Sequence, residues 1–103
     1  MPNFLITYQG QPQFSTPEDG KAHMGEWMAW MTGLGDAMVH PATPLFKTKI
    51  VGPKGVGDGE NFPISGFLII TATDMDAAIA IAKGDPFTKH ANVGVSEMMQ
   101  MPG

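Results

Sequence analysis

The longest helical pattern in the chain reads TPEDGKAHMGEWMAWMTGLG, over residues 16–35. Ser15 or Thr16 can cap its first turn, Pro17 fits the first helical position, and a closing glycine is typical of a helix end. Apolar residues recur inside it at the spacing of one helix face: Met24, Trp27, Met28, Met31 and Leu34. The pattern predicts a helix whose apolar stripe packs against the core of the domain.

His23 lies one residue away from this stripe and shares its edge with Trp27 and Trp30. The imidazole is therefore expected at the boundary of the core, where a histidine beside two indoles can form the wall of a cleft. A boundary histidine is more often a structural residue than a catalyst, so the local sequence alone favours the structural role.

A second, shorter helical pattern begins after Thr73 or Asp74, either of which can cap it, and ends at Gly84 and Pro86. Its buried face is expected to consist of Met75, Ala78, Ile79 and Ala82.

Four segments have the composition or alternation of β-strands: residues 3–8, 45–51, 65–73 and 93–101. The third is continuously apolar in its middle, as expected for a central strand covered on both faces. Prolines interrupt the segment before residue 45, so only an edge or bulged piece is expected there.

Residues 52–63 contain four glycines and two prolines, so they favour a mobile loop over a regular element. The stretch GPKGVG resembles a phosphate-binding loop, but it lacks the Gly-Lys-Ser/Thr ending and a helix after it. A flexible hairpin is the better prediction, and such a segment can act as a lid or as an arm between subunits.

The predicted order is strand, helix, strand, strand, helix, strand, which is the ferredoxin-like α+β arrangement with a four-stranded antiparallel sheet. Both helices would cover one face of this sheet. The other face, with Phe67, Ile69, Val93 and Val95, would expose apolar area, so we expect a homodimer formed through the sheet faces.

The amino-acid composition and net charge exclude several classes of function for this chain. The 103 residues suit a single domain, and the absence of cysteine excludes disulfides, zinc-thiolate sites and cysteine nucleophiles. A net charge of −4 without a lysine cluster argues against nucleic acid, and no apolar run is long enough for a membrane span. We expect a soluble cytoplasmic protein with no cofactor, and His23, His40 and His90 are too scattered to predict a metal site.

Three stretches together resemble the YCII-related domain family, which includes proteins named for a DGPF motif: AHMGEWMAWM at 22–31, ISGFLIITATDMDAAIAIAKGDPF at 64–87, and VGVSEMMQM at 93–101. The likeness spans nearly the whole chain, although the loop reads DGENFPISGF rather than DGPF. The resemblance implies a dimeric α/β barrel, in which two ferredoxin-like sheets face each other.

The resemblance also implies an active site made of the helix-borne His23 and of Asp85 from the Asp-Pro-aromatic signature, with Ser65 as a third polar member. In that site His23 would be the base and Asp85 would orient it. The alternative for Asp85 is structural, because an aspartate before Pro86 often caps the following turn.

The implied substrate is a small cyclic or aromatic metabolite, and Trp27, Trp30 and Phe87 could stack on it. Such aromatic residues more often belong to a core or a dimer interface. Two hypotheses therefore stand: an enzyme of the isomerase, lyase or dehydrochlorinase type that transfers protons, and a small-ligand-binding or accessory module without turnover.

Overall fold

The computed structural model describes residues 1–101. Within residues 1–101, ten elements follow one another: β1 (Asn3–Gln9), α1 (Pro17–Leu34), the short 3-10 helix η1 (Gly35–Ala37), β2 (Met38–Pro44), β3 (Lys49–Gly52), β4 (Gly55–Asp58), β5 (Ile64–Thr71), α2 (Met75–Lys83), the 3-10 helix η2 (Pro86–Lys89) and β6 (Val93–Glu97).

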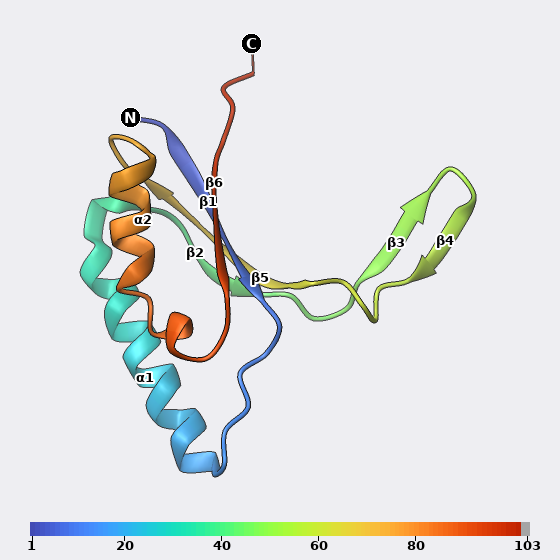
Figure 1. Cartoon of the computed structure of the whole chain (residues 1–103), viewed down its shortest axis with the longest axis horizontal. Coiled ribbons are helices and arrows are strands. Elements are labelled where there is room, and N and C mark those ends of the chain that lie inside the picture. Colours follow the sequence, from blue (N-terminus) through green and yellow to red (C-terminus); the bar gives the residue numbers. More distant parts are fainter. Residues whose placement is uncertain (102–103) are drawn as a thin grey trace.

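The main sheet is antiparallel, with the strand order β2-β5-β1-β6, and α1 and α2 pack on one of its faces (Figure 1). This is the predicted ferredoxin-like α+β fold, with one hairpin inserted between its second and third sheet strands. Thr16 caps α1 through a hydrogen bond that its side chain accepts from the Asp19 N–H at 3.2 Å, and Asp74 caps α2 in the same way.

The core lies between the sheet and the helices. Strand β1 alternates in burial, so Phe4, Ile6 and Tyr8 point toward the helices and are almost completely buried. Leu68 and Ile70 on β5 fill the same layer. The alternation therefore fixes which side of β1 meets α1, and it places Tyr8 at the end of the core.

The predicted stripe of α1 is partly wrong. Met24 and Met28 are 47% and 59% exposed, whereas His23 and Trp27 are the buried residues of the helix. The buried face of the helix is therefore shifted by about one residue from the predicted one. The line of His23 and Trp27 and the line of Met24 and Met28 both carry large side chains, so the sequence pattern does not show which of them meets the core. In α2 the small residues Ala78 and Ala82 are buried, while Met75 and Ile79 lie at the rim.

The prediction of a sheet strand at residues 45–51 is only partly right, because β3 covers residues 49–51 but lies outside the main sheet. The edge or bulged piece expected before residue 45 is confirmed as β2, which tolerates Pro41 and Pro44 because it is an edge strand with two register shifts against β5. Strand β3 pairs with β4 in a separate hairpin that begins at Lys49. A hairpin rather than a phosphate loop is confirmed, but β4 is a regular strand inside residues 52–63, where the sequence favoured a loop. Gly55 has a φ of +123°, a conformation that favours glycine, at the turn between them.

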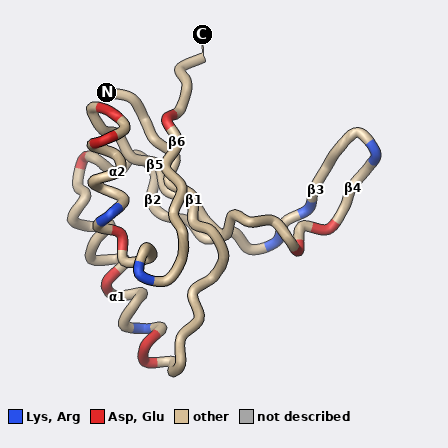
Figure 2. Tube along the Cα trace, in the orientation of Figure 1, with Lys and Arg blue, Asp and Glu red and all other residues tan. Residues whose placement is uncertain are grey.

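The β3–β4 hairpin projects away from the sheet and the helices (Figure 1), and all of its strand residues are exposed. Lys49 and Asp58 form an ion pair across it at 3.1 Å. Basic and acidic residues are interspersed along both the helices and the hairpin (Figure 2). In residues 1–101 neither helix is long and apolar enough to cross a membrane.

The open face of the sheet differs from the prediction in two residues. Val93 and Val95 pair with Tyr8 and Ile6 and pack against the core, so they face the helices. The apolar side chains of the open face lie on the central strands: Leu5, Phe67 and Ile69, with Leu5 directly opposite Ile69.

Candidate functional site

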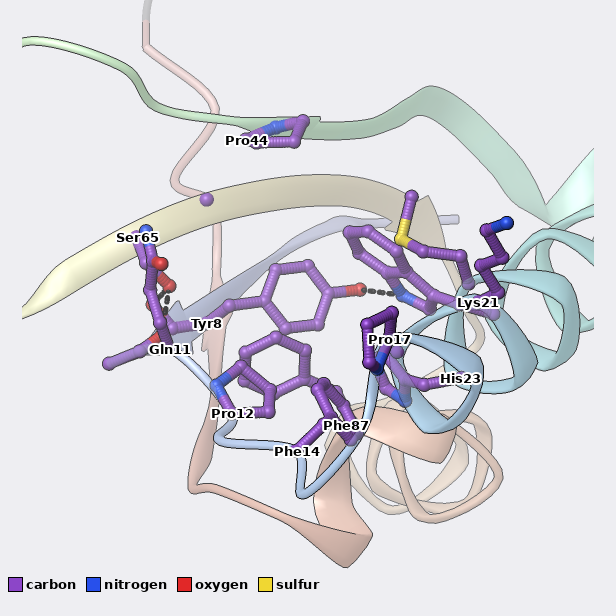
Figure 3. Close-up of a pocket in the computed structure, with 15 residues that line it drawn as sticks. Tyr8, Gln11, Pro12, Phe14, Pro17, Lys21, His23, Pro44, Ser65 and Phe87 are labelled. Carbon is purple, nitrogen blue, oxygen red and sulfur yellow. Dashed lines mark hydrogen bonds between the residues drawn. The ribbon is translucent and has the colours of Figure 1, made fainter.

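A cavity of about 600 Å³ lies between the end of β1, the first turns of α1 and the loop that joins them (Figure 3). Its lining is mostly apolar and includes Tyr8, Phe14, Trp27 and Phe87. His23 stands on its α1 side, and Ser65 lies at the opposite end, with Tyr8 between them. A cavity of this size and polarity suits a compact ring compound.

Tyr8 is the centre of the aromatic group. Because β1 alternates, its side chain continues the inward row of Phe4 and Ile6 and reaches the cavity. Its ring packs edge-on against Trp27 with centroids 5.3 Å apart and lies 4.6 Å from that of Phe87. These contacts fix the ring, so the position of its hydroxyl is set by the core.

A chain of hydrogen bonds joins this hydroxyl to Asp85. Trp27 Nε1 donates to the Tyr8 hydroxyl at 3.4 Å, and the hydroxyl donates to Asp85 Oδ2 at 2.6 Å. The other carboxylate oxygen, Oδ1, accepts the Phe87 N–H at 2.9 Å, so Asp85 is the N-cap of η2. Asp85 therefore has the capping role considered from the sequence and, in addition, holds a side chain of the cavity.

Burial dominates the titration of this pair. It raises the pKa of Asp85 above its ordinary value, although the hydrogen bonds from Tyr8 and Phe87 oppose the rise. The pKa of Tyr8 is strongly raised, first by burial and then by the carboxylate beside it. Tyr8 consequently remains a protonated donor at physiological pH.

His23 is 8% exposed and lines the cavity. Its Nδ1 atom is buried and has no hydrogen-bond partner within residues 1–101. Burial, and then the nearby His90, lower the pKa of His23, while the charge of Asp85 partly opposes this. The imidazole is therefore neutral near pH 7 and can accept a proton.

His23 and Asp85 lie close enough for their charges to interact. In the part of the chain that is described, however, the carboxylate makes its hydrogen bonds to Tyr8 and Phe87 and none to the imidazole. Asp85 is therefore bonded to the aromatic residues that lie beside His23, and its role in orienting His23 as a base remains a prediction.

The other predicted site residues do not all line the cavity. The Ser65 hydroxyl lies within hydrogen-bonding distance of the carbonyl oxygens of Tyr8 (3.2 Å) and Gly10 (2.5 Å), so it fastens the loop after β1. Trp27 and Phe87 line the cavity, whereas Trp30 is outside its lining, and its indole lies against Gly84 at the end of α2.

Two residues of the cavity, Tyr8 and Phe14, are not among the predicted site residues. For Tyr8 a signal existed, because the alternation of the first strand puts every second residue on the core side.

The three histidines lie in two different places. His40 stacks on Phe67 with the ring centroids 5.1 Å apart, while His23 and His90 are neighbours at the same distance. No group of three or more potential metal ligands is found in residues 1–101.

The profile of the YCII-related domain matches residues 2–102. The chain belongs to the YCII-related domain family. A comparison with curated proteins found no significant match. Among solved structures, the YCII-related chain resembles the 5-chloro-2-hydroxyhydroquinone dehydrochlorinase TftG from Burkholderia phenoliruptrix AC1100, solved in complex with 2,5-dihydroxybenzoquinone. The two are 18% identical with a TM-score of 0.61, over 96% of this chain and 95% of the other, which shows a shared fold.

Proposed function

We propose that this YCII-related protein is a small-molecule enzyme in which His23 removes a proton from a hydroxylated cyclic or aromatic metabolite. The observation that carries the proposal is the environment of His23: a buried imidazole with a lowered pKa in the wall of an apolar cavity. A neutral base of this kind suits general base catalysis near pH 7.

The substrate class rests on the lining of the cavity. Trp27, Phe87 and Tyr8 offer faces and edges on which a planar ring can stack, and few polar groups compete for it. The quinone bound by TftG is a ring of this type, although the likeness between the two proteins extends only to the fold.

In the proposed step, a hydroxyl proton of the substrate, or a proton on a saturated carbon next to a carbonyl, moves to a nitrogen of His23, and the electron pair left behind is delocalised into the ring or the carbonyl. The pair then expels a leaving group such as chloride, or takes a proton back at another atom. The charge of Asp85 stabilises the imidazolium through space, while Tyr8 holds that carboxylate in place.

The test compares His23→Ala with Met28→Ala, a substitution at an exposed position on the same helix outside the cavity lining. Turnover of a panel of hydroxyquinones and lactones is followed by absorbance, and ligand affinity by the quenching of tryptophan fluorescence. We expect His23→Ala to lower kcat by about 10²–10⁴-fold and to change Kd by only a few fold. Full turnover by His23→Ala would refute the proposal.

A binding module without turnover is the second candidate. The observation that favours it is that the oxygens of Asp85 bond Tyr8 and the Phe87 N–H instead of the imidazole. Under this hypothesis the wild type binds ring compounds and transforms none of them.

We also propose a homodimer through the open face of the sheet. Leu5, Phe67 and Ile69 form an apolar strip along its two central strands, and such a strip can meet its own copy about a two-fold axis. Light scattering after size exclusion is expected to give twice the mass of the chain, and Phe67→Lys is expected to give a monomer. A monomeric wild type would refute the dimer.

A further inference from the structure

His23 lies between an apolar cavity and a more polar groove. One is the apolar cavity described above, and the other, which we call the polar groove, lies between α1 and η2 and has Asp19, Glu26, Lys89 and His90 in its lining. His23 and Phe14 line both. The imidazole is thus a part of the wall between the apolar cavity and the polar groove.

His90 stands against the groove side of this wall. Its ring is nearly perpendicular to that of His23, at 83°, with the centroids 5.1 Å apart. The Phe14 ring lies 5.2 Å from His23 and 5.0 Å from His90, so it packs against both. The two rings share no hydrogen bond within residues 1–101, so a proton would pass between them through one bridging water.

The two histidines differ in exposure. His23 is buried, whereas His90, which follows η2, is exposed to solvent. On the inner side of His23, Asp85 is 1% exposed and bonds Tyr8 and the Phe87 N–H, so a proton passed to it would not continue to water. When a ring compound fills the apolar cavity, the polar groove is therefore the direction in which a proton on His23 can reach water.

The charges around the pair are mixed. Glu26 on α1 bonds Lys89 on η2 at 3.0 Å, Asp19 lines the groove beside them, and Asp85 lies on the inner side. A positive charge passing from His23 to His90 thus moves toward a surface that holds both signs and is screened by water.

We propose that His90 is a proton-relay residue, which takes the proton collected by His23 and releases it to solvent through the polar groove. This inference rests on the proposed function of His23. In each cycle the His23 imidazolium gives its proton to the free nitrogen of His90, and His90 loses a proton to water or buffer. Each ring ends the cycle with the protons it had at the start, so no other reactant is needed.

The first experiment measures the steady-state kinetics of His90→Gln at low and high buffer concentration. We expect kcat to fall by about tenfold in dilute buffer, KM to stay within twofold, and added free imidazole to restore the rate, because a soluble base can replace the relay. Lys89→Gln is the matched comparison: it removes a neighbouring charge but no titrating ring, so its effect should not depend on buffer. An unchanged kcat, or a loss that imidazole does not restore, would overturn the relay.

The second experiment needs no turnover. Ring ¹H–¹⁵N spectra give the titration of His23 and the exchange of its ring N–H with water, in the wild type and in His90→Gln. We expect His90→Gln to raise the pKa of His23, since the charge of His90 lowers it, and to slow the exchange. Unchanged exchange refutes the relay even if the enzyme is active. If the panel gives no turnover while exchange slows, the proposed function fails and the relay pair stands.

Discussion

The cavity and the β3–β4 hairpin are built in opposite ways. At the cavity, Tyr8 and Asp85 are each 1% exposed and are joined by a hydrogen bond across 77 positions of the chain. In the hairpin, the two strands pair only with each other, and Phe46 in the preceding connection is 92% exposed. The same kinds of group therefore contribute differently: the aromatic rings and the carboxylate at the cavity are fixed by the core, whereas Phe46 and the carboxylate of Asp58 in the hairpin remain in water.

The largest expected effect is the loss of a buried ring at the cavity. Trp27→Ala removes an indole that contacts Tyr8 and donates to its hydroxyl, so it should lower the free energy of unfolding by about 3–5 kcal/mol. Val56→Ala, in the exposed strand β4, should change it by less than about 0.5 kcal/mol. Urea denaturation measures both. Similar losses would mean that the hairpin is packed in solution.

The next effect comes from removing a single oxygen. Tyr8→Phe leaves Asp85 Oδ2 and Trp27 Nε1 without their partner and should cost about 1–3 kcal/mol in the free energy of unfolding. It should also raise the pKa of Asp85 further, because the Tyr8 bond lowers it. The cost should thus be larger at neutral pH than in acid, where the carboxyl is uncharged. Thr71→Val, which removes a half-buried hydroxyl bonded to the Pro2 carbonyl, is the control.

A smaller effect should appear in the dependence of stability on pH. The pKa of His23 is lowered in the folded state, so below about pH 6.5 the unfolded chain takes up a proton at this residue before the folded protein does. Stability is therefore complete above that pH and declines as the pH falls toward the folded pKa. Denaturation curves of His23→Asn should lack this share of the decline. An identical pH profile in the variant would contradict the lowered pKa.

The smallest effect is expected in the hairpin. Lys49→Ala removes the exposed ion pair with Asp58, and such pairs contribute about 0–1 kcal/mol. Thermal unfolding in low salt should show a Tm slightly below that of the wild type, and this difference should become smaller in high salt. A loss as large as that of Tyr8→Phe would show that this pair is shielded from water by another surface.

The order of elements could be predicted because it depends on local patterns, namely helix caps, alternation and glycine punctuation. The face of α1 could not, since the line of His23 and Trp27 and the line of Met24 and Met28 are adjacent and both carry large side chains. The edge strand expected before residue 45 is confirmed as β2, but its pairing with β5 and the separate pairing of β3 with β4 depend on tertiary contacts. For the site, the sequence singled out His23 but missed Tyr8. The partner of Asp85 depends on tertiary packing, which spacing along the chain does not encode.

Asp85 satisfies two hydrogen-bond donors at once, the Tyr8 hydroxyl with one carboxylate oxygen and the Phe87 N–H with the other. Asparagine there would keep an acceptor for the Phe87 N–H but would turn an amide donor toward a phenol that is itself donating, and glutamate would be too long to satisfy both ends at once. The Asp-Pro-aromatic signature is thus a shape requirement as much as a chemical one. Relatives with an altered residue at this position should also carry a compensating change at the end of their first strand.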